Sequence, residues 1–248
     1  MPTTLDKDVL AFRCQFAAED QAVAFPIRKF GMNLVTAAGD DVWDGSNVYT
    51  GWLATAAAIE VVSASVADDV GQNGATGIRI IGLDENYDRQ TADVVMDGST
   101  AVDVTGKKWI RVFRAYITGS GSGQVNAGNI TIRVDGAGAT LAIITAGYGQ
   151  TEMCLYTIPA GYFGMLFSWH NEVKGESAAT VTATFHISTN KNGEGWRVRQ
   201  VCDVVDGGSE HHWMGGLKLD PKTDIRVRTS AISKAAPTSS EFALICMK

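Results

Sequence analysis

The densest group of side chains able to bind a metal ion is the run Glu210-His211-His212-Trp213. Imidazole and carboxylate groups are common zinc ligands, but the chain has only 4 histidines in all with which to complete a site. Adjacent residues of a strand point to opposite faces, so His211 and His212 would not reach the same ion unless the backbone bends. We therefore expect no metal here, and interpret the run as a subunit contact in which His and Trp offer flat, amphipathic surface.

Enzymes that use a nucleophile, or that bind phosphate through a glycine-rich loop, leave local sequence signatures. The segment Gly119-Ser120-Gly121-Ser122-Gly123 is the nearest approach to either. It has no strand-to-helix pattern around it, it lacks the lysine of a phosphate-binding loop, and no dinucleotide fingerprint occurs elsewhere. We predict that this segment is a linker, that the chain is not an enzyme and that it uses no cofactor.

Aromatic and basic residues suggest protein contacts instead. Trp43 lies in Asp40–Gly45, which has the composition of a loop, and an aromatic residue on a loop is a typical interface hot spot. Two alternating pairs of arginines would line one face if their strands are neighbours; that face is either solvated or docked on an acidic partner, since guanidinium groups pair well with carboxylates. The candidate interface residues are Trp43, Tyr49, Trp52, Arg197, Arg199, His211, His212, Trp213, Arg226 and Arg228.

The elements that would carry these residues are short β-strands. From Ile78 onward, alternating segments are separated by turn residues about every ten positions, a spacing typical of a β-sandwich or jelly roll. Asp97-Gly98 and Pro159-Ala160-Gly161 are the clearest turns. The predicted strands are Ile78–Leu83, Thr91–Met96, Trp109–Ile117, Asn129–Val134, Thr140–Thr145, Thr151–Ile158, Tyr162–Asn171, Thr180–Thr189, Trp196–Val204, His211–Leu219, Asp224–Ala231 and Glu241–Met247.

We predict an all-β fold with two domains. Residues 1–118 would form a smaller N-terminal β domain that anchors the chain, residues 119–128 a Gly/Ser-rich linker, and residues 129–248 a jelly-roll-like β-sandwich. The Ala-rich segment Ala54–Val66 fits a short helix or a strand, and its β-branched half from Ile59 favours the strand.

Charge and cysteine content limit the partners. The formal net charge is −6 and the sequence pI about 5.2, so a nucleic acid is not expected as the main partner. Residues 1–20 lack the apolar core of a signal peptide, and no apolar run approaches the roughly 20 residues that span a membrane. The four cysteines, Cys14, Cys154, Cys202 and Cys246, have no metal-site spacing, and we expect them to be reduced and buried.

Four segments resemble a group of virion structural proteins of tailed bacteriophages. They are Asn47-Val48-Tyr49-Thr50-Gly51, the run from Ile78 to Tyr87, the run from Val125 to Ile132, and Tyr156-Thr157-Ile158-Pro159-Ala160-Gly161. The likeness covers residues 47 to 248. It implies a β-rich particle component without catalytic residues, assembled in the host cytoplasm.

Two placements on such a particle follow from the resemblance. A capsid decoration or cement protein would bridge subunits of the major capsid protein through exposed β-edges and loops, whereas a neck or tail component would form a ring or trimer with other tail proteins. We favour decoration, because the chain lacks the heptads or repeated turns of a fibre. In both cases it would be a homo-oligomer built on large contact areas. The alternative from another class is a carbohydrate-binding β-sandwich module.

Overall fold

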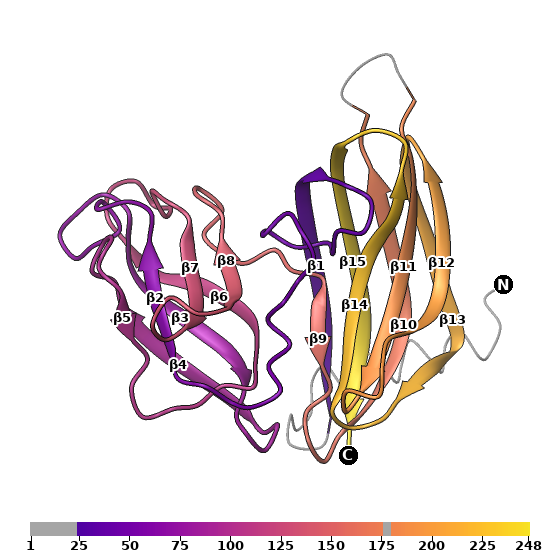
Figure 1. Ribbon diagram of the computed structural model, residues 1–248, viewed down its shortest axis with the longest axis horizontal. Coiled ribbons are helices and arrows are strands. Elements are labelled where there is room, and N and C mark those ends of the chain that lie inside the picture. The colour runs from indigo at the N-terminus through magenta and orange to yellow at the C-terminus, as the bar shows by residue number, and fades with distance from the viewer. Residues whose placement is uncertain (1–23, 176–179) are drawn as a thin grey trace, which may run out of the picture.

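The computed structural model describes residues 24–175 and 180–248, and in these ranges it contains strands and no helix. The strands form two lobes that lie side by side (Figure 1). They are β1 (Ala24–Thr36), β2 (Ile59–Ser63), β3 (Ala75–Leu83), β4 (Arg89–Val95), β5 (Val102–Asp103), β6 (Arg111–Ser120), β7 (Ile130–Val134), β8 (Thr140–Ile144), β9 (Leu155–Thr157), β10 (Phe163–Val173), β11 (Thr182–Lys191), β12 (Arg197–Val205), β13 (Gly207–Leu219), β14 (Thr223–Ile232) and β15 (Ala236–Met247).

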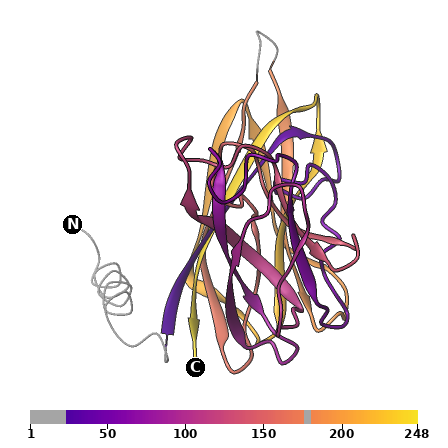
Figure 2. The ribbon, with the colours of Figure 1, turned by 90° about the vertical axis from the view of Figure 1, so that its left-hand side faces the viewer.

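The smaller lobe consists of strands β2 to β8 (Figures 1 and 2). One sheet has the order β5-β2-β7-β8 and the other the order β4-β3-β6, with antiparallel pairing throughout. Alternate residues point inward, so Ile78 and Ile80 of β3 are fully buried while their neighbours are partly exposed. The core between the sheets also holds Trp109, Ile130 and Ile132.

The larger lobe is a β-sandwich of eight strands. Its sheets have the orders β1-β15-β10-β13 and β12-β11-β14-β9. Trp169 and Phe242 of the first sheet and Phe185 of the second are completely buried in the core between them. At one side of the sandwich, β12 is the edge of one sheet and β13 the edge of the other; a tight turn at Asp206, with φ of 34°, connects the two.

The all-β class and the sandwich are confirmed. The expected strand Ile78–Leu83 lies within β3, and the β-branched half of Ala54–Val66 forms β2. The turn glycines behave as expected, since Gly98 and Gly161 have φ values of 57° and 73°, which disfavour residues with a side chain. The sequence reasoning missed β1, whose 13 residues alternate in burial and pair along β15.

The division of the sheets does not follow the predicted domain boundaries. β7 and β8, which follow the predicted linker 119–128, pair with β2 in the smaller lobe, whereas β1 comes from the N-terminal part and pairs with β15 in the larger one. The glycine-rich run is packed, because Gly121 N donates to Gly74 O at 2.8 Å and a Cβ on Gly121 would lie 1.9 Å from the Gln72 carbonyl oxygen. Its glycines allow close backbone approach rather than a flexible joint.

Cys154, Cys202 and Cys246 are free thiols; the first and last are buried and Cys202 is half-buried, so the expected burial is only partial there. Cys14 lies outside the described residues. In the described ranges, no helix long and apolar enough to cross a membrane is found.

Candidate interaction surfaces

The loop between β1 and β2 joins the two lobes through the carboxylate of Asp41. This side chain is fully buried and accepts two hydrogen bonds from Arg228 of β14, at 2.8 and 3.1 Å. It also accepts the backbone N–H of Tyr49 at 2.8 Å. The Tyr49 hydroxyl donates to the carbonyl of Leu141 in the smaller lobe at 2.9 Å. The loop is therefore tied to both lobes.

A second buried ion pair connects the lobes directly. Arg111 of β6 donates two hydrogen bonds of 2.8 Å to Asp224 of β14, and the two side chains are only 7% and 3% exposed. Arg111 also donates to the Leu53 carbonyl at 2.7 Å, and Thr157 donates its hydroxyl to Asp224 at 2.6 Å. Each charged group thus has several hydrogen-bond partners, as a buried ion pair requires.

Four aromatic rings continue the junction from the loop onto the larger lobe. Trp43, Tyr49, Trp52 and Trp196 form a chain of edge-to-face contacts with ring centroids 5.0 to 5.1 Å apart. The guanidinium of Arg226 lies over the Trp196 ring, 3.9 Å from its centroid, a short cation–π distance. These contacts lie inside the molecule, between its own lobes.

This placement corrects the expectation for the loop residues. Trp43 and Tyr49 were predicted to offer an exposed interface, but they are 3% and 2% exposed, because the loop is covered by both lobes. Trp52, Arg226 and Arg228 belong to the same internal junction. The residues that complete it, Arg111, Asp224 and Trp196, were not identified from the sequence, where their separation gives no local signal.

The two arginine pairs do not share a face. β12 and β14 both flank β11, as neighbours on one sheet would, but Arg226 lies opposite Ser188 whereas Arg197 lies opposite Thr189. Successive residues of β11 point to opposite faces, so the two arginines do as well. Arg199 donates to the Thr189 hydroxyl at 2.7 Å, so its side chain lies on the same face of the sheet as that of Arg197. Both are exposed, at the rim of the sandwich.

The remaining candidates, His211, His212 and Trp213, lie on β13. Successive side chains of this strand point to opposite faces, as expected. His212 pairs with Glu210 at 3.0 Å on one face, and the His211 ring contacts the Trp213 ring on the other, with centroids 4.5 Å apart. Trp213 packs partly against the sandwich core, so it contributes to stability as well as surface.

The side of the sandwich formed by β12 and β13 carries exposed apolar side chains. We call it the β12–β13 edge. Val198, Val201 and Val205 are 52%, 45% and 62% exposed, and Met214 of β13 is 83% exposed. The valines lie opposite Ser188, His186 and Thr182, alternate residues of β11, and therefore share one face of the sheet. Figure 1 places β12 and β13 on the side of the larger lobe remote from the smaller lobe.

A cleft of about 420 Å³ lies between the lobes on the β1 side. Its polar lining includes Arg28, which pairs with Glu241, and Arg114, which is exposed and within 3.4 Å of the Gln150 side chain. Phe30 adds an aromatic ring that is 41% exposed. The cleft thus combines aromatic and hydrogen-bonding groups on a junction that the ion pairs hold in place.

Two titratable groups interact electrostatically here: Lys29, which is buried and lines the cleft, and Asp44, which is half-buried. Burial lowers the pKa of Lys29, whose ammonium donates to the Phe113 carbonyl, to about 7. Burial also raises the pKa of Asp44 to about 7, against opposing hydrogen bonds from the Glu152 backbone and the Thr145 hydroxyl. Each group is thus about half protonated near neutral pH.

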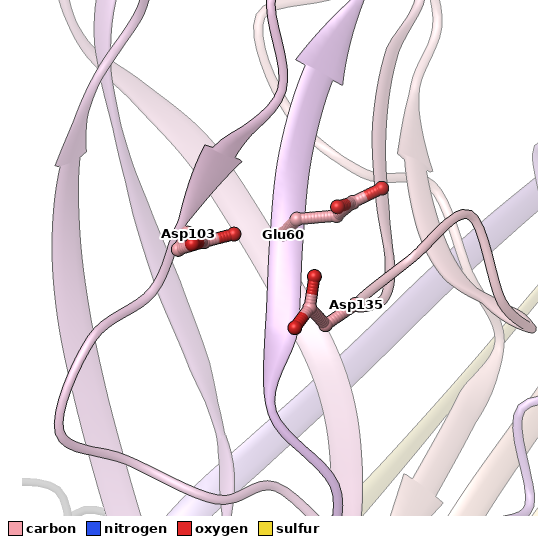
Figure 3. Close-up of side chains that lie close together, drawn as sticks. All are labelled: Glu60, Asp103 and Asp135. Atoms are coloured by element: carbon pink, nitrogen blue, oxygen red, sulfur yellow. The ribbon is translucent and has the colours of Figure 1, made fainter.

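The smaller lobe brings three carboxylates together, as Figure 3 shows: Glu60 and Asp103 on paired strands and Asp135 just after β7. Their oxygens lie within 4.8 Å of one another. The Glu60 carboxylate already accepts hydrogen bonds from Arg133 at 2.6 Å and from the Ala137 backbone at 3.1 Å. The Arg133 contact lowers the Glu60 pKa, and the group serves to hold the β7–β8 turn.

No protein-family model and no curated protein matches the chain. Among solved structures, the tandem CBM22-1–CBM22-2 domain of Xyn10C from Paenibacillus barcinonensis is 10% identical, with 94% of this chain and 96% of that chain covered and a TM-score of 0.26. The VP2 subviral particle of infectious bursal disease virus is 9% identical, with 99% and 78% covered and a TM-score of 0.14. Similarities this low support no functional assignment.

Proposed function

We propose that the chain is a non-enzymatic structural protein of a tailed-phage virion, and that it decorates the capsid by binding neighbouring subunits of the shell. The observation that carries this proposal is the β12–β13 edge. Two long strands end their sheets on the same side of the sandwich, with apolar side chains exposed. Unpaired strand edges with such side chains are surfaces on which another protein can add a strand.

The ion pairs between the lobes also fit a structural protein that must withstand mechanical force. The buried pairs Arg111–Asp224 and Arg228–Asp41 fix one lobe against the other, so that a force on one lobe is passed to the other. A cement protein bound at one surface would then stabilise the shell against the pressure of the packaged genome.

Mass spectrometry and imaging of purified particles test this proposal. We expect a fixed copy number per particle, in register with the symmetry of the shell. Particles assembled without the chain should release their DNA at a lower temperature than complete particles. Unchanged release temperature would contradict the cement role and leave a neck or tail position, in which the copy number would match a ring or trimer. Absence of the chain from purified particles would contradict both positions.

A carbohydrate-binding module is the second candidate, and the interlobe cleft is the observation that favours it. Sugars bind to aromatic faces together with polar groups, and Phe30 and Arg114 offer these at the cleft. Binding of the isolated chain to a glycan array, lost in F30A and R114A but kept in V95K, would support this function. Val95 is the control because it lies at the end of β4 opposite to Arg89, which lines the cleft. An array without signal would count against it.

A further inference from the structure

We propose that the interlobe cleft binds an acidic sugar, whose carboxylate is held between cationic side chains of the two lobes. The inference rests on the second candidate function, carbohydrate binding, and names the class of ligand. Its basis is an excess of positive charge in the cleft, which contrasts with the net charge of −6 of the whole chain.

One wall of the cleft belongs to β1, on the side of the larger lobe that faces the smaller lobe (Figure 1). This strand contributes two adjacent cations, Arg28 and Lys29. Arg28 pairs with Glu241, which is the one carboxylate among the described residues that line the cleft. Lys29 is 7% exposed and donates to the Phe113 carbonyl, but no described carboxylate forms an ion pair with it.

The opposite wall belongs to the smaller lobe and carries Arg89 of β4 and Arg114 of β6. In the sheet β4-β3-β6, Arg89 lies opposite Leu83 and Arg114 lies opposite Ile81, both of β3. Leu83 and Ile81 pack against the core of the larger lobe, and side chains directly opposite each other share a face of the sheet. Both arginines therefore point from the smaller lobe toward the larger one.

Neither Arg89 nor Arg114 forms an ion pair with a described residue. Arg114 donates to the side-chain oxygen of Gln150 at 3.4 Å, and Arg89 lies over the Phe25 ring, 4.2 Å from its centroid. These partners are neutral, so both positive charges remain available to an anion. Guanidinium groups bind carboxylates through pairs of parallel hydrogen bonds.

Lys29 and Arg114 lie close enough to repel each other across the cleft. Burial is the main cause that lowers the pKa of Lys29 to about 7, and the charge of Arg114 lowers it further. A carboxylate bound between these groups would offset the repulsion and favour the protonated form of Lys29.

The remaining lining suits a ring rather than a bare ion. The cleft has a volume of about 420 Å³, within the range of pockets that hold small organic ligands. The Phe30 ring is 41% exposed there and offers an apolar face beside the cations. A sugar ring that carries a carboxylate combines the two features that the cleft can recognise.

Titration calorimetry of the isolated full chain tests the inference. The probes are oligosaccharides of glucuronic acid, galacturonic acid and sialic acid, each compared with its neutral methyl ester. We expect at least one acid to bind and its ester to bind at least about 10-fold more weakly, because the ester cannot accept charge-assisted hydrogen bonds. R89Q and R114Q should each weaken binding of the acid by a similar factor.

A matched control separates the cleft from the general charge of the sheet. R79Q removes one positive charge from β3, outside the cleft lining, and should bind the acid as the wild type does. An equal loss in R79Q and R114Q would overturn the inference.

Three other results would also overturn it. Equal binding of acid and ester would do so and leave carbohydrate binding standing as a candidate function. Failure of every acid to bind at millimolar concentration would contradict the ligand class. Tighter binding of a tri-glutamate peptide than of every acidic sugar would assign the cleft to an acidic protein segment instead. The virion role is tested separately, by the composition of purified particles.

Discussion

Arg111 of the smaller lobe and Asp224 of the larger lobe face each other through two parallel hydrogen bonds of 2.8 Å, away from solvent. With Asp41 and Arg228, they make the junction between the lobes a charged, hydrogen-bonded contact. A hydrophobic junction could slide, but a bidentate ion pair has one geometry. The lobes should therefore move together when a partner binds.

Replacing Arg111 by methionine should lower the free energy of unfolding by about 3–5 kcal/mol, because it leaves the Asp224 carboxylate buried without its partner. The matched control is Arg79 and Asp93, which have the same bidentate geometry but side chains that are 44% and 58% exposed. R79M should lower the free energy of unfolding by at most about 1 kcal/mol, because the ion pair is exposed to solvent. Equal losses in the two variants, measured by urea unfolding, would show that the junction is not a source of stability.

The pH dependence that these two groups contribute to stability should have its minimum near pH 7. Asp44 keeps its proton in the folded chain up to about pH 7, whereas the unfolded chain loses it near the ordinary value of 3.8, so its contribution falls as the pH rises between these values. Lys29 loses its proton near pH 7 when folded and near 10.5 when unfolded, so its contribution rises over that interval.

The variants D44N and K29M separate these two effects. The difference in unfolding free energy between wild type and D44N should change only on the acid side of pH 7, and that between wild type and K29M only on the alkaline side. Differences that do not vary with pH would contradict the placement of these groups in buried surroundings.

The close approach of β1 to the loop and to Cys154 depends on a glycine. A Cβ on Gly31 would lie 2.2 Å from the Cys154 backbone nitrogen and 2.5 Å from the Val42 carbonyl oxygen. The substitution G31A should therefore lower the melting temperature and reduce the free energy of unfolding by about 1–3 kcal/mol. Gly215 of β13 has open space around it, and G215A should be close to neutral. Similar melting temperatures for the two variants would be inconsistent with this packing.

The sequence predicts strands well where alternation and turn chemistry are local. Gly98 and Gly161 sit at the turns that their types indicate, and Ile78 and Ile80 face the core as alternation requires. The pairing of distant strands is not encoded locally. Nothing near β1 indicates that Ala24–Thr36 crosses to β15, and this pairing is what overturns the predicted division into domains.

The interface residues show the same limit. Trp43 has the composition of a loop residue, and it is on a loop, but the loop is buried between the lobes. Whether Arg197 and Arg226 share a face depends on the register of both strands against β11, which a single sequence does not specify. Val198 and Val201 fall within the predicted strand Trp196–Val204, but the outward face that they share with Val205 became visible only with that register.

An electron cryomicroscopy map of the purified particle tests the central claim most directly. If the chain is a structural component that assembles through the β12–β13 edge, the map will contain it at a fixed number of symmetry-related positions, with β12 in contact with a neighbouring chain. A map in which every position of the shell, neck and tail is filled by other proteins, or in which β12 and β13 of this chain face solvent, would contradict the account.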